Sequence, residues 1–160
     1  MGTSTFSGPV RSTAGFVSGV DSLVSATAAT LTVTADAHAG RTVLLDRAAG
    51  IAVTLPLATG TGNAYRFLVL TTITSNSTTI KVVDATDVMA GVALVANDTD
   101  ASASIFETAS TSDTITFNGT DTGGIRGATV DLHDVATDLW SVHVCGAATG
   151  SEATPFSATV

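Results

Sequence analysis

Two histidines and one aspartate near the C-terminal end of the sequence are its strongest candidates for chemistry. Asp131 and His133 lie in one run of alternating apolar and polar residues, and His143 lies in the next run. A hairpin through residues 136–138 would place all three on one sheet face. Two imidazoles and a carboxylate can ligate a transition metal. Because outward strand faces carry such residues without binding anything, we expect no metal site and no cofactor here.

Two other segments, residues 97–100 and 118–121, resemble fragments of calcium-binding loops. Their closely spaced side-chain oxygens suit a hard cation, but neither segment ends in the bidentate glutamate of a complete loop. Turns rich in Asn and Asp contain the same residues because those side chains hydrogen-bond to nearby backbone. The sequence favours such turns and leaves a bound calcium ion as the alternative.

Other catalytic patterns are missing from the sequence. No Gly-x-Ser-x-Gly elbow occurs, and Glu107 and Glu152 are the only glutamates, so no strand carries the paired carboxylates of a glycosidase. Cys145 lies near the end of an apolar run, where we expect it to be inert packing. We expect Trp140 to pack in the core, together with Phe67 and Phe117, and we expect no enzymatic activity.

The elements that would position these residues are short β-branched runs separated by turn residues. We expect strands at residues 31–34, 42–46, 51–55, 65–74, 78–83, 92–96, 104–108, 114–118, 129–135 and 139–145. The run 88–96 also fits a helix, but Gly91 and the following Asn-Asp turn favour a strand. No helical stretch is long enough for a crossover, so hairpins should dominate. The expected fold is all-β, an antiparallel β-sandwich or a jelly-roll-like barrel.

Residues 67–70 are continuously apolar. This is expected of a central strand that is covered on both faces, or of a strand whose outer face meets another subunit.

The chain divides into an extended N-terminal arm, residues 1–29, and a single β-body, residues 30–160, that ends in an extended segment. The arm is rich in Gly, Ser, Thr and Ala and carries spaced apolar residues without strand or helix periodicity. Such residues need a partner surface, or they pack on the body of their own chain. The last residues, 155–160, are expected to cross to a neighbouring subunit.

Composition limits the partners. Charged residues make up 12% of the 160 residues, and the formal net charge is −8. A phosphate backbone requires clustered Lys and Arg, so we expect no nucleic-acid partner. We also expect neither a leader peptide nor a membrane-spanning segment. The single cysteine excludes an intrachain disulfide.

Three parts of the sequence carry a resemblance to a known family. They are residues 5–12 (TFSGPVRS) with Gly15-Phe16, residues 51–56 (IAVTLP) followed by 60–67 (GTGNAYRF), and residues 87–91 (DVMAG). Together they resemble small structural proteins of tailed bacteriophages, most closely the capsid decoration, or cement, proteins. The resemblance implies a virion protein on the outer surface of the capsid. There it would form homotrimers that bridge and stabilise neighbouring major capsid proteins.

On this resemblance, Phe6, Val10 and Phe16 would be anchors in the capsid or in an adjacent subunit, and Arg11 would pair with a carboxylate there. The alternative is a phage fibre or appendage piece, or a carbohydrate-binding β-module. A carbohydrate-binding module would need exposed aromatic residues along a groove.

Overall fold

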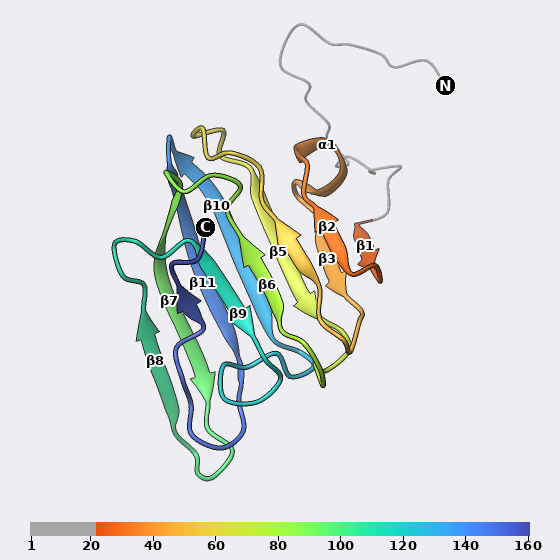
Figure 1. Cartoon of the computed structure of the whole chain (residues 1–160), viewed down its shortest axis with the longest axis vertical. Helices are drawn as coiled ribbons and strands as arrows, with labels where there is room; N and C mark the ends of the chain where they lie inside the picture. Colours follow the sequence, from red (N-terminus) through yellow and green to blue (C-terminus); the bar gives the residue numbers. More distant parts are fainter. Residues whose placement is uncertain (1–21) are drawn as a thin grey trace, which may run out of the picture.

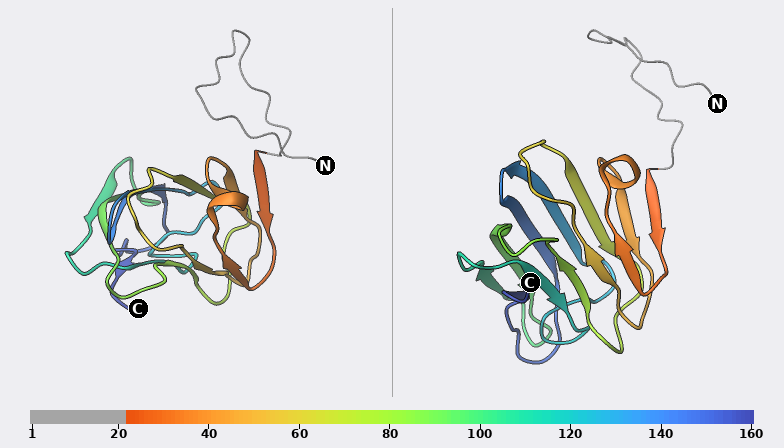
Figure 2. Two further views of the ribbon diagram at one scale, coloured as in Figure 1. Left: turned by 90° about the horizontal axis from the view of Figure 1, so that it is seen from above. Right: turned by 45° about the horizontal axis from the view of Figure 1, so that its top comes forward.

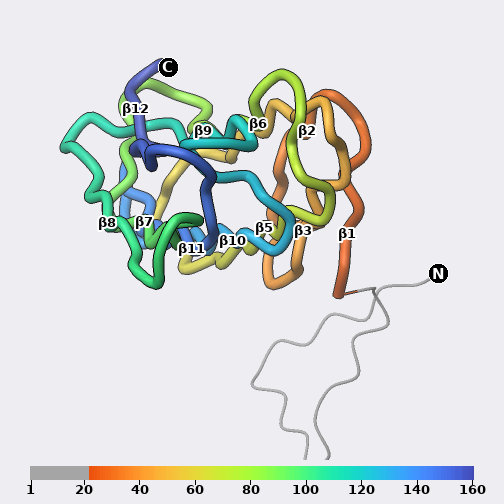
Figure 3. Tube along the Cα trace, turned by 90° about the horizontal axis from the view of Figure 1, so that it is seen from below, coloured from red at the N-terminus to blue at the C-terminus, as the bar shows by residue number. Residues whose placement is uncertain are grey.

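Alternating side chains give most strands one buried and one outward face, and this alternation builds two packed β-sheets. The computed structural model describes residues 22–160. Figure 1 shows the two layers face on, and Figure 2 shows them from two further directions. Figure 3, seen from below, places β1 and β8 at opposite ends of one layer. The expected all-β sandwich is confirmed.

We call the larger layer sheet A. Its strands, in spatial order, are β1 (Leu23–Ala26), β3 (Thr42–Leu45), β5 (Ala64–Val69), β10 (Thr129–Ala136), β11 (Leu139–Ala147), β7 (Val88–Ala96) and β8 (Ala103–Glu107). Sheet B has the order β12 (Phe156–Ser157), β9 (Thr114–Phe117), β6 (Thr78–Lys81), β4 (Ala52–Thr54) and β2 (Thr30–Thr32). The short helix α1 (Ala35–His38) connects β2 to β3.

The first six strands alternate between the two sheets. β1, β3 and β5 are parallel neighbours in sheet A, and β2, β4 and β6 are parallel neighbours in sheet B. Parallel strands need a crossover, which is usually a helix. Here the crossover between two strands of one sheet is a strand of the other sheet.

This winding corrects the expectation of antiparallel sheets dominated by hairpins. Five of the ten strand pairings within residues 22–160 are parallel, and both sheets are mixed. The jelly-roll-like connection is not confirmed. The prediction failed because it looked for crossovers made by helices and did not consider crossovers made by strands.

The core lies between the sheets. Phe67, Val130 and Leu132 reach it from sheet A, and Ile80 and Ile115 from sheet B, each with at most 1% of its surface exposed. Burying a side chain of this size stabilises the fold by about 1.5–3 kcal/mol. Because alternate residues of most strands in sheet A are buried in the core, the residues between them point to the outer face of the sheet.

Most expected strands are present with small boundary differences, and 88–96 is a strand, as predicted. The boundary between arm and body was wrong, because Leu23–Ala26 forms β1 and pairs in parallel with β3. The C-terminal segment does not extend away from the body. Phe156 is buried, β12 pairs with β9, and the Asp113 carboxylate accepts the backbone N–H groups of Thr159 and Val160. In the part of the chain described, no helix is long and apolar enough to span a membrane.

Candidate functional site

The face of sheet A that points away from sheet B is built from alternate residues of each strand. In β7, Ala93 and Val95 are buried, so Val92 and Leu94 point outward. In β11 the same alternation points Cys145 outward. The phase of each strand therefore decides which side chains a partner could touch.

Apolar side chains gather at the β7–β8 end of this face. Leu94 lies opposite Ile105 of β8 on one side and opposite Cys145 of β11 on the other. Val92 and Leu94 each keep 38% of their surface exposed, and Ile105 keeps 69%. We call Val92, Leu94, Ile105 and Cys145 the β7–β8 patch. A sheet face left in water is normally polar, and contiguous exposed apolar side chains mark interaction surfaces.

The histidines and the aspartate of the predicted hairpin lie on the same outward face. Asp131 is the cross-strand partner of His143, and His133 lies opposite Ser141. The prediction that the three share a face is confirmed. Asp131 is paired with Arg66, whose Nε lies 3.1 Å from Asp131 Oδ1. Within residues 22–160, no group of three His, Cys, Asp or Glu side chains is arranged to hold a metal.

A shallow hollow of about 320 Å³ adjoins this ion pair, beside the first residues of β3 and β5 and the middle of β10. Arg41, Arg66 and His133 contribute its basic groups, and Asp131 contributes an acidic one. Because the Arg66–Asp131 pair is exposed to solvent, it contributes at most about 1 kcal/mol to stability. The hollow has the chemistry to accept a carboxylate, but Asp131 already neutralises one of its two arginines.

Asp134 holds the loop between β4 and β5. Its carboxylate accepts the backbone N–H groups of Thr59 at 2.9 Å and Gly60 at 2.6 Å, and both the N–H and the hydroxyl of Thr61. Desolvation raises the pKa of Asp134, but these hydrogen bonds outweigh it and leave the pKa below its ordinary value. This buried carboxylate is thus occupied in fixing a loop.

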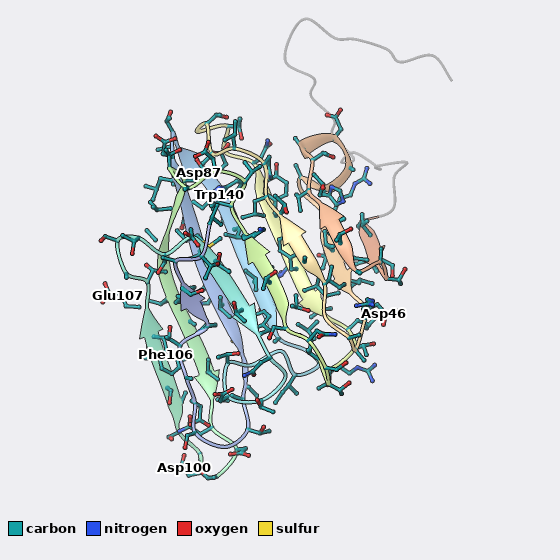
Figure 4. All side chains as sticks on the ribbon, viewed as in Figure 1. Asp46, Asp87, Asp100, Phe106, Glu107 and Trp140 are labelled. Carbon is teal, nitrogen blue, oxygen red and sulfur yellow. The ribbon has the colours of Figure 1, made fainter. Side chains whose placement is uncertain are left out.

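A second buried carboxylate, Asp87, lies beside Trp140 (Figure 4). Asp87 Oδ2 accepts the N–H of Ala58 at 3.0 Å, whereas Asp87 Oδ1 and Trp140 Nε1 are buried without a hydrogen bond of ordinary geometry. Desolvation raises the pKa of Asp87, and the neighbouring Ala58 and Trp140 N–H groups offset it only in part. Sequence reasoning missed Asp87. Its position directly before a long apolar run was the available signal.

The two segments that resemble calcium loops form local hydrogen bonds. Asp100 Oδ1 accepts the N–H and the hydroxyl of Ser102, and Asn118 Oδ1 accepts the N–H and the hydroxyl of Thr120. These are the turn interactions that the sequence favoured over a calcium site. Asp100 Oδ1 and Asn118 Oδ1, which a calcium ion would need as ligands, therefore accept hydrogen bonds within their own turns.

The prediction for Cys145 was wrong. We expected inert packing, but Cys145 is exposed because β11 buries its even-numbered residues, such as Val144. The aromatic predictions were right: Trp140, Phe67 and Phe117 are buried, and Trp140 packs edge-to-face on Tyr65 with ring centroids 5.7 Å apart.

The predicted partner-binding residues Phe6, Val10, Arg11 and Phe16 lie outside the described residues. The β7–β8 patch was not predicted. Its signal is the run Val92-Ala93-Leu94, where large residues alternate with a small one. This pattern does not show that the large residues face outward, because the neighbouring strands decide which of the two alternating sets of residues faces the core.

No protein-family model, curated protein or solved structure matches the chain. The fold and the outward face therefore define its class on their own. It is a two-sheet, all-β sandwich protein with mixed sheets and an exposed apolar patch at one end of the larger sheet.

Proposed function

We propose that this chain is a virion structural protein that decorates and stabilises the outer surface of a tailed-phage capsid. Its partners would be the major capsid protein and further copies of itself, expected as trimers that bridge neighbouring capsid proteins. The resemblance of residues 5–12 with Gly15-Phe16, of 51–56 with 60–67, and of 87–91 to decoration proteins motivates this proposal. It assigns the chain a binding role and no catalytic step.

The observation that carries the proposal is the β7–β8 patch. Ile105, Leu94 and Val92 are exposed on a sheet face, although the same chain buries a large apolar core between its sheets. Leaving such side chains in water is unfavourable by roughly 25 cal/mol per Å² of apolar surface. A protein that works on the surface of a larger assembly recovers this free energy when it docks.

The polar residues of the body support a structural role. The carboxylates of Asp134 and Asp113 bind backbone N–H groups, and Asp131 pairs with Arg66. A sugar-binding module receives less support, because Tyr65, Trp140 and the phenylalanines of residues 22–160 are buried or half-buried. Stacking on a sugar requires an exposed ring face.

Co-sedimentation with capsids tests the proposal. The capsids should come from the phage whose genome encodes the chain, and they should be prepared without this protein. Wild-type protein is expected to pellet with the capsids and to saturate, and Leu94→Glu should weaken its binding at least about tenfold because a charge must then be desolvated. Leu57→Glu is the matched control, since Leu57 is also exposed (54%) but lies outside the patch.

Trp140, the only tryptophan, is fully buried, so its fluorescence reports whether each variant is folded. Folded wild-type protein that stays in the supernatant at every concentration would refute the capsid role. Equal binding by Leu94→Glu and wild type would show that the patch is not the docking surface.

A further inference from the structure

The outer edge of β8 carries unpaired backbone groups. In the β7–β8 ladder, Thr108 N donates to Gly91 O and Asn97 N donates to Ser102 O, each at 3.1 Å. Hydrogen-bonded and non-hydrogen-bonded pairs alternate along an antiparallel ladder. In this alternation, three residues of β8 direct their N–H and C=O groups away from β7. They are Ala103, Ile105 and Glu107.

Within residues 22–160, no other segment pairs with this edge, since β8 is the last strand of sheet A. Figure 4 shows Phe106 and Glu107 along it, at the margin of the molecule. Natural proteins protect such edges with Pro, Lys, inward-pointing charges or bulges. β8 (ASIFE) has no Pro and no Lys, its register with β7 is continuous, and its one charged residue, Glu107, lies at its end.

We propose that the β8 edge pairs with the β8 edge of a second copy of this chain, antiparallel and about a two-fold axis at Ile105. The two larger sheets would then join into one continuous sheet. This inference uses the same end of the molecule as the proposed capsid-docking patch, but it concerns an interaction between copies, which experiments in solution without capsids test separately.

The edge is self-complementary in this register. A two-fold axis at Ile105 pairs Ile105 with its own copy and pairs Ala103 with Glu107 of the second copy. The N–H and C=O groups of all these residues point away from β7, toward the second copy. Each pair can therefore exchange two backbone hydrogen bonds. A register shifted by one residue would face these groups with the inward-directed groups of Ser104 and Phe106.

Side chains agree with the same register. Ile105 meets an identical apolar side chain, and cross-strand pairs of this kind stabilise a sheet. Glu107 faces alanine, so the two glutamates do not face each other. The β7–β8 patches of the two copies become one strip, in which Leu94 and Ile105 of each copy are adjacent. The row formed by Leu94 and Ile105 of both copies carries no charged side chain, and Glu107 of each copy borders it, opposite Val92.

A two-fold contact of this kind differs from the contacts inside a trimer. On a capsid it would join copies that belong to neighbouring trimers. Closed two-fold interfaces use the same surface on both partners, as this register does.

Disulfide trapping tests the pairing in the full-length chain with Cys145→Ser as background. Ile105→Cys should form a covalent dimer under oxidised glutathione, because paired Cα atoms would lie about 5.5 Å apart, within disulfide range. Leu57→Cys, exposed but away from the edge, is the control. Ala103→Cys and Glu107→Cys chains should cross-link when mixed, and far more than either does alone.

Sedimentation velocity of the untrapped chain gives a second measurement. Ile105→Lys should weaken association through this edge at least about tenfold, whereas Leu57→Lys should not change it. The proposal is overturned if Ile105→Cys cross-links no more than Leu57→Cys. It is also overturned if Ala103→Cys chains link to each other as readily as to Glu107→Cys chains.

Discussion

The carboxylate of Asp134 in β10 accepts two hydrogen bonds from Thr61, one from the backbone N at 3.0 Å and one from the hydroxyl Oγ1 at 2.6 Å. The residues come from segments far apart in the sequence, so the contact ties the β4–β5 loop to the middle of sheet A. Only 3% of Asp134 is exposed, and water has little access to it.

Removing this carboxylate should destabilise the fold. We expect Asp134→Ala to lower the free energy of unfolding by about 2–3 kcal/mol, because several donors lose a charged acceptor. Thr61→Ala removes one donor and should cost about 1 kcal/mol. Urea unfolding followed by Trp140 fluorescence measures both losses. Equal losses would mean that the backbone N–H bonds contribute little.

The lowered pKa of Asp134 predicts acid sensitivity. The ionised form is favoured in the folded state, so this contribution is present above the unfolded pKa, near 3.8, and is lost as pH falls through the lower folded pKa. Below about pH 4, the stability of the wild type should therefore decline more steeply than that of Asp134→Asn. Unfolding free energies measured across this range would show parallel curves if Asp134 were unimportant.

The ionisation of Asp87 should make stability depend on pH in the opposite direction to that of Asp134. Its folded pKa is raised, so its stabilising contribution is complete below the unfolded value, near 3.8, and is lost as pH rises through the higher folded pKa. Asp87→Asn removes this titration, and its stability should depend less on pH above about pH 4. The same urea series checks the prediction, and an unchanged slope in Asp87→Asn would contradict it.

Gly91 is required by a close backbone approach. A Cβ placed there would lie 1.7 Å from Val142 O in the neighbouring strand β11. Gly91→Ala should therefore push β7 from β11 and cost about 3 kcal/mol or more. Gly127→Ala is the control: no atom lies within 4 Å of its Cβ, so it should cost only about 1–2 kcal/mol for its positive φ. Thermal unfolding that ranks the two variants in reverse order would contradict this explanation.

The arm hypothesis predicts a loss of binding without a loss of folding. Phe6→Ala together with Phe16→Ala should weaken capsid co-sedimentation, because aromatic anchors commonly dominate docking energy. Trp140 fluorescence should stay unchanged, since the two residues belong to the predicted arm. Capsid affinity equal to that of the wild type would count heavily against a role for the arm.

The sequence was sufficient to predict the strands and the buried aromatic residues. Runs such as Ile51–Leu55 and Thr114–Phe117 show period-two alternation, which depends only on local geometry. The parallel winding was not predictable in this way. Pairing Leu23 with Thr42, or Thr30 with Ala52, depends on contacts between distant segments, and no local pattern encodes them.

The site was predicted only in part. The shared face of Asp131, His133 and His143 followed from one hairpin, and this geometry is local. The β7–β8 patch needs the phase of β7 relative to its non-local neighbour β11, and Cys145 was misplaced for the same reason. An apolar run considered without its neighbouring strands does not show which of its residues face the core.

The strands β1 to β6 give the N-terminal half of the sandwich a modular construction. Each full turn of the chain adds one strand to both sheets and contacts mainly the turns beside it, as in repeat proteins. Duplication or loss of one complete turn would lengthen or shorten this end without disturbing the opposite end, where β7, β8 and β12 lie. Evolution could thus change the reach of this half while leaving the β8 edge intact.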